Sequence, residues 1–145
     1  MYYEELVLRY LTLKNKGTRY SQANIQDYMD DYLESQCKEF DDTQIETDKT
    51  LFVNIMKILA KLKDENIFKL GKRYFTTSMY DAIMLSLSEN TIDLEELNIE
   101  QLGKKIAILK EDDNFNKYVG SASSNPTSIT NKVKIARKVL LDITE

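Results

Sequence analysis

Residues 25–33 read IQDYMDDYL, and the spacing of the apolar residues in this stretch decides the fold class. The apolar positions are Ile25, Tyr28, Met29, Tyr32 and Leu33. They fall at i, i+3, i+4, i+7 and i+8, which is one face of an amphipathic α-helix. The same period recurs through most of the chain, which has only 4 glycines and 1 proline to form turns. We therefore predict an all-α protein.

Helical periodicity predicts further helices on both sides of this one. They run approximately over residues 1–16, 43–62, 77–87, 98–109 and 129–143. Thr43-Gln-Ile-Glu46 has the pattern of a capping box at the start of one helix, and Thr127 or Ser128 is expected to cap the last. The sequence predicts a single helical bundle-like domain of six or seven helices over residues 1–145, with at most a short β-hairpin near 67–75.

The two ends of the chain predict a fragment of a longer protein. The first helix begins at Met1 without capping residues, and the last one runs almost to Glu145.

No segment approaches the run of about 18 apolar residues that a membrane span needs. The N-terminal MYYEELVLRY also lacks the basic and apolar regions of a signal peptide. We expect a soluble, cytoplasmic domain with no membrane partner.

Composition excludes several kinds of catalytic site. The chain has no histidine, which removes histidine-dependent serine or cysteine catalysis and histidine-ligated zinc. It has a single cysteine, Cys37, which falls in helical register beside Tyr28, Met29 and Leu33 and is expected to be a buried structural thiol. No Gly-rich phosphate loop is present. We expect no catalytic residue, no bound metal and no cofactor.

Acidic residues are concentrated in one segment. Residues 27–48 hold nine acids against one lysine, Lys38, and therefore a net charge of −8. Four of these acids share one helix face, at Asp27, Asp30, Asp31 and Glu34. Such a face can bind a divalent cation, but a solvated face is the expected role because the ligands come from one element only. Glu111-Asp112-Asp113 is expected to favour the N-terminus of the helix that follows it.

Basic residues gather near the end of the chain. Lys132, Lys134, Arg137 and Lys138 lie on the last predicted helix, directly after the small polar loop 121–127. Hydroxyls and amides at a helix N-terminus with cations nearby can bind phosphate. The predicted phosphate or DNA contacts are Ser124, Thr127, Lys134, Arg137 and Lys138. A solvated helix face is the alternative, because the net charge of the whole chain is −4.

A smaller basic turn contains Lys69, Lys72 and Arg73, next to Tyr74 and Phe75. Aromatic rings beside cations can stack on bases. Packing in the core is the default role for the two rings.

Four segments in order resemble a known family. They are EELVLRYL at 4–11, IQDYMDDYL at 25–33, FTTSMYDAIM at 75–84, and Phe115 followed by a small polar loop and VKIAR at 133–137. This pattern is similar to the helical region that follows the ParB/sulfiredoxin-like domain of GmrSD-type restriction endonuclease proteins. The resemblance implies a bacterial or phage-related protein engaged in cutting modified or foreign DNA. The family's Asp-Gly-Gln-Gln-Arg motif and its HNH nuclease domain are both missing, so no catalytic residue is carried over.

These observations lead to two functional expectations. The first is a non-catalytic helical accessory region of a restriction-type protein, which packs against the ParB-like N-terminal domain and supports DNA engagement. In it Arg9 is expected to be structural, with its charged head against an acid of a neighbouring element. The second is a free-standing helical protein-interaction module with an acidic binding face. An enzyme that works without histidine is a third, less favoured, reading.

Overall fold

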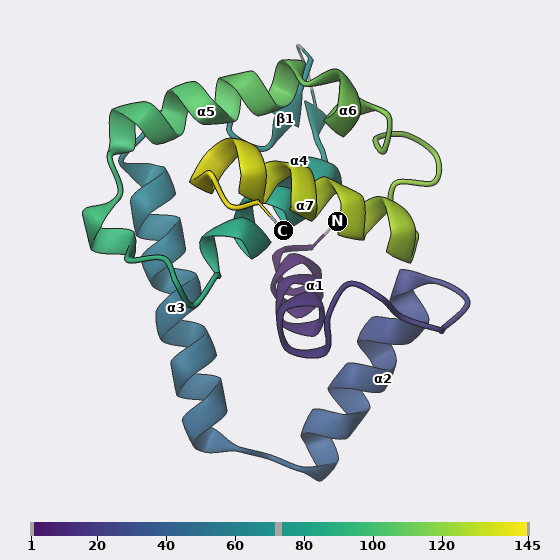
Figure 1. Ribbon diagram of the computed structural model, residues 1–145. Coiled ribbons are helices and arrows are strands. Elements are labelled where there is room, and N and C mark those ends of the chain that lie inside the picture. Colours follow the sequence, from purple (N-terminus) through teal and green to yellow (C-terminus); the bar gives the residue numbers. More distant parts are fainter. Residues whose placement is uncertain (1, 72–73, 145) are drawn as a thin grey trace.

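The computed structural model describes residues 2–71 and 74–144 and confirms the all-α prediction (Figure 1). Within these residues the chain forms seven α-helices, one 3-10 helix and one two-stranded antiparallel hairpin. The elements are α1 (Tyr3–Lys16), α2 (Ile25–Lys38), α3 (Asp42–Ala60), β1 (Lys69–Leu70), β2 (Tyr74–Phe75), α4 (Thr77–Leu87), η1 (Leu94–Glu96), α5 (Ile99–Glu111), α6 (Asp113–Asn116) and α7 (Pro126–Leu141). The hairpin lies inside the only segment that favoured extended structure.

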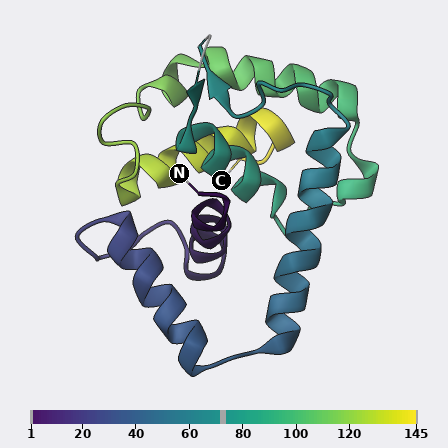
Figure 2. The same ribbon diagram turned by 180° about the vertical axis from the view of Figure 1, so that it is seen from behind.

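Helix α4 forms the centre of the molecule. Every residue from Ser78 to Leu87 is buried, including Ile83 and Met84 at 0% exposure. A helix that is apolar on nearly all sides has no solvent face and must be surrounded. α7 packs along α4, α5 packs on α7, and α1 packs on α4 from another side (Figures 1 and 2). Burial of each large apolar side chain contributes about 2 kcal/mol, so this helix is the main hydrophobic anchor of the fold.

Side-chain caps define where the helices begin, and two of the predicted caps are wrong. Asp41, not Thr43, caps α3, because its carboxylate accepts from the backbone N–H groups of residues 43 and 44. Asn125, not Thr127 or Ser128, caps α7, with Pro126 in the first turn. Asp and Asn are as good N-caps as Ser, and proline suits the first position of a helix. The sequence thus offered several adequate caps within a few residues of each other.

Helices α2 and α3 extend away from the body and meet at the segment around Phe40, with the end of α1 between their upper parts (Figures 1 and 2). Tyr28, Met29 and Tyr32 are buried where α2 lies against α1. Farther along α2 this cover ends, and Cys37 is exposed. The prediction of a buried thiol is therefore wrong. Helical register places Cys37 on the apolar face correctly, but nothing in the described residues covers that part of the face.

Candidate phosphate-binding surface

A buried ion pair fixes α1 to α4 beneath the predicted site. Nε and Nη2 of Arg9 donate to the two carboxylate oxygens of Asp81 at 2.7 and 2.6 Å. Both side chains are almost fully buried, at 5% and 0% exposure. Burial acts to lower the pKa of Arg9, but the hydrogen bond and charge of Asp81 outweigh it and the net shift is upward. Arg9 is therefore the structural cation that the sequence predicted.

The loop before α7 is attached to this ion pair. Nη2 of Arg9 also donates to Oγ of Ser124 at 3.2 Å. The backbone carbonyl of Ser124 accepts a hydrogen bond from the hydroxyl of Tyr20, whose ring stacks on that of Tyr28 with 4.8 Å between centroids. Ser124, one of the predicted phosphate contacts, therefore takes part in an internal network that holds the loop against α1 and α4.

Lys132 is a second cation inside the fold. Its side chain is 0% exposed, and Nζ donates to Oγ of Ser78 at 2.8 Å and to the carbonyl of Ser123 at 2.6 Å. Burial lowers the pKa of Lys132 to about 8, although Asp81 acts in the opposite direction. The sequence grouped Lys132 with the surface cations of α7, and the structure corrects this. Its spacing of three residues from Ile129 places it on the buried face.

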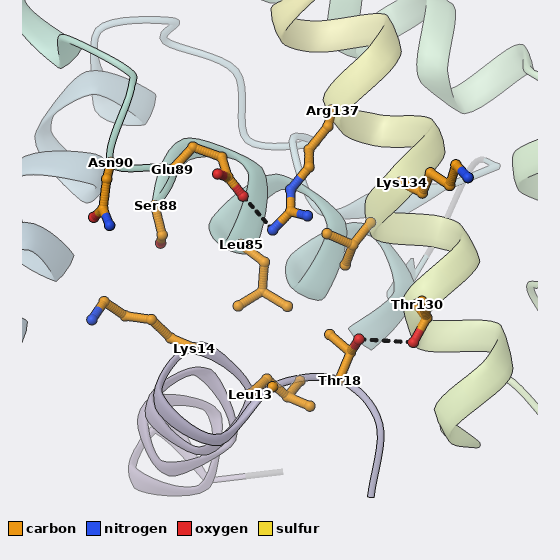
Figure 3. Close-up of a pocket in the computed structure, with 12 residues that line it drawn as sticks. Leu13, Lys14, Thr18, Leu85, Ser88, Glu89, Asn90, Thr130, Lys134 and Arg137 are labelled. Carbon is orange, nitrogen blue, oxygen red and sulfur yellow. Dashed lines mark hydrogen bonds and ion pairs between the residues drawn. The ribbon is translucent and has the colours of Figure 1, made fainter. Parts of the chain in front are cut away.

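A pocket of about 410 Å³ lies where the ends of α1 and α4 meet α7 (Figure 3). Arg137 forms an ion pair with Glu89 across it, and the hydroxyls of Thr18 and Thr130 are hydrogen-bonded at 2.7 Å. In Figure 3, Arg137 turns toward Glu89 while Lys134 extends outward from α7. The pocket is lined by Leu13, Lys14, Gly17, Thr18, Leu85, Ser88, Glu89, Asn90, Thr130, Val133, Lys134 and Arg137.

A second pocket, of about 380 Å³, continues this surface toward the start of α7. It shares Thr130 with the first pocket and is otherwise lined by Arg19, Pro126, Thr127 and Asn131. We call the combined surface the α7 strip. Its charged side chains are Lys14, Arg19, Glu89, Lys134 and Arg137.

The structure brings three of the five predicted contact residues onto the α7 strip. Lys134 and Arg137 line the first pocket and Thr127 the second. Lys138 is exposed on α7 but lines neither pocket, and Ser124 belongs to the internal network.

Two cations of the strip, Lys14 and Arg19, were missed by the sequence reasoning. They come from the end of α1 and the turn after it, more than a hundred residues before α7. The only signal for them was a small group of basic residues around Gly17.

The acidic candidates have structural roles or are solvated. Asp27, Asp30, Asp31 and Glu34 are all exposed. The carboxylate of Asp112 caps α6 by accepting from the backbone N–H of residue 115, as the sequence predicted for this acidic run. Across residues 2–71 and 74–144, no group of three or more acidic or thiol side chains is placed to hold a metal ion.

The basic turn near the hairpin is only partly described. Lys72 and Arg73 lie outside the described residues. Of its rings, Tyr74 is 73% exposed, while Phe75 packs near Phe68 and Tyr80 at centroid distances of 6.0 Å. Core packing, the default for both rings, is wrong for Tyr74, and Phe75 is not in the core either, because it is 41% exposed although its ring packs on other aromatic side chains.

Comparison of the chain with protein-family models, curated proteins and solved structures finds no match in any of the three. No helix in the described part of the chain has both the length and the apolar character needed to cross a lipid bilayer.

Proposed function

We propose that this chain is a non-catalytic helical accessory module of a restriction-type protein, and that its α7 strip contacts DNA phosphates. The observation that carries the DNA contact is the composition of the strip. Four cations line the strip, Lys14, Arg19, Lys134 and Arg137, against one acid, Glu89, which is paired with Arg137, while Lys14 is paired with Asp48 beside the strip. Phosphate contacts supply most of the sequence-independent affinity of proteins for DNA. The restriction context rests on the resemblance of the four sequence segments.

The overall acidity of the chain does not oppose this proposal, because charge is separated along it. The whole chain has a net charge of −4, and residues 27–48 alone have −8. The remaining residues therefore carry +4, and the α7 strip lies among them. Attraction between exposed charges is screened beyond about 10 Å at 0.1 M salt. A phosphate at the strip therefore responds mainly to the cations beside it.

Two further features of the strip suit an oxyanion. Thr127 and Pro126 lie at the N-terminal end of α7, where the helix dipole favours negative charge. The hydroxyls of Thr18 and Thr130 lie on the strip and are hydrogen-bonded to each other, which leaves one of the two O–H groups to donate to an oxyanion. The fixed loop before α7 keeps this end in place, since Arg9 and Lys132 both donate to it. The module would thus present a preformed surface to the DNA backbone.

The test is equilibrium binding of a labelled DNA duplex, measured by fluorescence anisotropy at several salt concentrations. Each phosphate that is neutralised contributes about −0.9 to the slope of log K against log salt, so two to four contacts predict a slope of about −2 to −4. Arg19→Glu combined with Lys134→Glu changes two exposed side chains of the strip. We expect this variant to lose on the order of tenfold or more in affinity.

The matched control is Lys57→Glu combined with Lys61→Glu, which makes the same charge change at two exposed positions, one in the last turn of α3 and one directly after it. Circular dichroism of both variants checks that the fold is kept. The control should bind DNA like the natural chain. Equal loss in both variants, or no binding of the natural chain at low salt, would overturn the proposal.

A further inference from the structure

The end of α2, the start of α3 and the segment between them form an arm that the described residues leave uncovered. We define the α2–α3 arm as residues 33–47, the lower part of the molecule in Figure 1. Every residue from Cys37 to Thr47 is exposed. These residues include Phe40 at 70% exposure and Ile45 at 36%. Large apolar side chains that are exposed close together, here in the connection between the two helices and on α3, are typical of a binding surface.

The exposed apolar residues of the arm continue the buried face of α2. Met29 is 1% exposed under α1, whereas Leu33, one turn farther, is 49% exposed. Cys37 follows one turn after Leu33 on the same face, and Phe40 lies two residues beyond the end of α2, in the segment that leads to α3. Three positions on one face of α2 and Phe40 just past its end thus form an apolar stripe, of which only Met29 is covered. A helix face of this kind normally packs against another element.

The arm is anchored at its base. Asp48, at 4% exposure, accepts from Nζ of Lys14 at 2.8 Å, from Nδ2 of Asn15 at 2.8 Å and from Nε2 of Gln44 at 3.0 Å. Nδ2 of Asn15 also donates to the hydroxyl of Tyr32 at 3.0 Å. This cluster joins α1, α2 and α3 at the point where the cover by α1 ends. The arm therefore projects in a fixed direction. Because its base is already ordered, a partner that binds the stripe does not have to immobilise it, and no entropy is lost there on binding.

The charge of the arm and of the α2 residues before it indicates what kind of partner would bind. Eight acids of the segment 27–48 are exposed, and the one lysine, Lys38, is paired with Glu34 at 2.6 Å. These exposed acids are Asp27, Asp30, Asp31, Glu34, Glu39, Asp41, Asp42 and Glu46. DNA and anionic lipid would be repelled by them, and so would the arm of a second copy. The surface suits a partner that is both apolar and positively charged.

We propose that the α2–α3 arm docks a positively charged amphipathic α-helix of another protein or domain. The apolar face of that helix packs on Leu33, Cys37 and Phe40, and its basic residues meet the acids on either side. Recognition of amphipathic helices by apolar surfaces with flanking charges is a common mode of binding. This docking does not depend on DNA binding, because the arm and the α7 strip share no residue.

The chain contains its own reporter for this test. Cys37 is its only cysteine, is exposed and lies between Leu33 and Phe40 on the stripe. The probe is an amphipathic peptide of Leu and Lys, long enough for roughly five helical turns. We expect the peptide to bind in a titration and to slow alkylation of Cys37 by iodoacetamide on the order of tenfold, as burial of the thiol requires. A peptide of the same composition, scrambled so that its leucines share no face, should do neither.

A pair of variants separates apolar docking from general attraction. Leu33→Ser with Phe40→Ser removes the stripe and should weaken peptide binding on the order of tenfold or more. The matched control, Tyr74→Ser with Ile108→Ser, removes two apolar side chains of 73% and 59% exposure far from the arm and should bind normally. Both retain every acid. Equal binding by the scrambled peptide, unchanged binding by the Leu33/Phe40 variant, or no protection of Cys37 would each overturn the proposal. The proposal would also be overturned if the natural chain formed dimers and the Leu33/Phe40 variant did not, because the arm would then bind a second copy of the chain.

Discussion

Replacement of the buried lysine, Lys132→Met, should change how the stability of this protein depends on pH. The Nζ atom of Lys132 is enclosed between Ser78 and the carbonyl of Ser123. Burial lowers the pKa of this amine from 10.5 to about 8. The folded protein therefore releases the proton at a lower pH than the unfolded chain does. Between these two values the unfolded state binds more protons, so the free energy of unfolding rises with pH.

The size of the effect follows from the same pKa values. Each tenfold change in a protonation equilibrium is about 1.4 kcal/mol, so keeping Lys132 charged in the fold costs about 3 kcal/mol at neutral pH. This cost disappears as pH rises through the window from about 8 to 10.5. Between about pH 7 and pH 9.5 the natural chain should gain roughly 2 kcal/mol relative to the Lys132→Met variant. The prediction concerns how the difference in free energy of unfolding between the two proteins changes with pH. It does not say which protein is more stable at any one pH.

Ionisation of buried tyrosines also changes the free energy of unfolding at high pH and must be separated from the effect of Lys132. Burial raises the pKa of Tyr10, Tyr28 and Tyr80, so these groups lower stability as pH rises above about 10. They are common to both proteins, and their contribution cancels in the difference. Urea unfolding at several values from about pH 6 to pH 9.5 gives the required free energies. Lys138→Met, at an exposed position on the same helix, is the control and should run parallel to the natural chain. If the Lys132→Met curve also runs parallel, the pKa of the buried amine is not lowered in the folded protein.

Two further predictions concern the contacts that hold α7 and its loop in place. Asp81→Asn leaves the buried guanidinium of Arg9 opposite a neutral amide and should lower the free energy of unfolding by about 3–5 kcal/mol, measured by urea denaturation. A double replacement, Arg9→Met with Asp81→Leu, should recover much of this loss, and failure to recover any would contradict the electrostatic explanation. Asn125→Ala removes the cap that accepts from the backbone N–H of Ser128 at 2.7 Å and should cost about 1 kcal/mol in thermal unfolding. Ser121→Ala in the same loop should cost little by comparison, and an equal effect of the two would count against the cap.

Much of the fold could be predicted because helical periodicity is a local property. The stretch IQDYMDDYL predicted α2, and the apolar residues after Thr77 predicted the helix α4, although not its burial on all sides. Periodicity states which side chains share a face, but it does not state how much of that face another element covers. For this reason Met29 and Cys37 looked equivalent in the sequence, although α1 covers the first and leaves the second exposed.

The site was predicted only where its residues are neighbours in the chain. Lys134 and Arg137 share α7 and were found, whereas Lys14 and Arg19 reach the same surface through the packing of α1 on α4 and were not. The partner of Arg9 lies 72 residues away, so only the type of that partner could be expected. Lys132 is different, because its place beside Ile129 and Val133 on one face was visible in the sequence. Its position on the apolar face of α7 therefore predicts burial better than the basic residues near it in the sequence predict exposure.

Salt is the variable that separates the two proposed surfaces. Binding at the α7 strip relies on cations that replace counterions of a phosphate backbone, so it should decline steeply with added salt. Binding at the α2–α3 arm combines charge with burial of Leu33 and Phe40, and burial of apolar surface does not depend on screening. The arm should therefore keep a larger share of its affinity at high salt than the strip. A DNA-binding curve and a peptide-binding curve with the same salt slope would mean that both reflect only long-range charge, and that neither surface is specific.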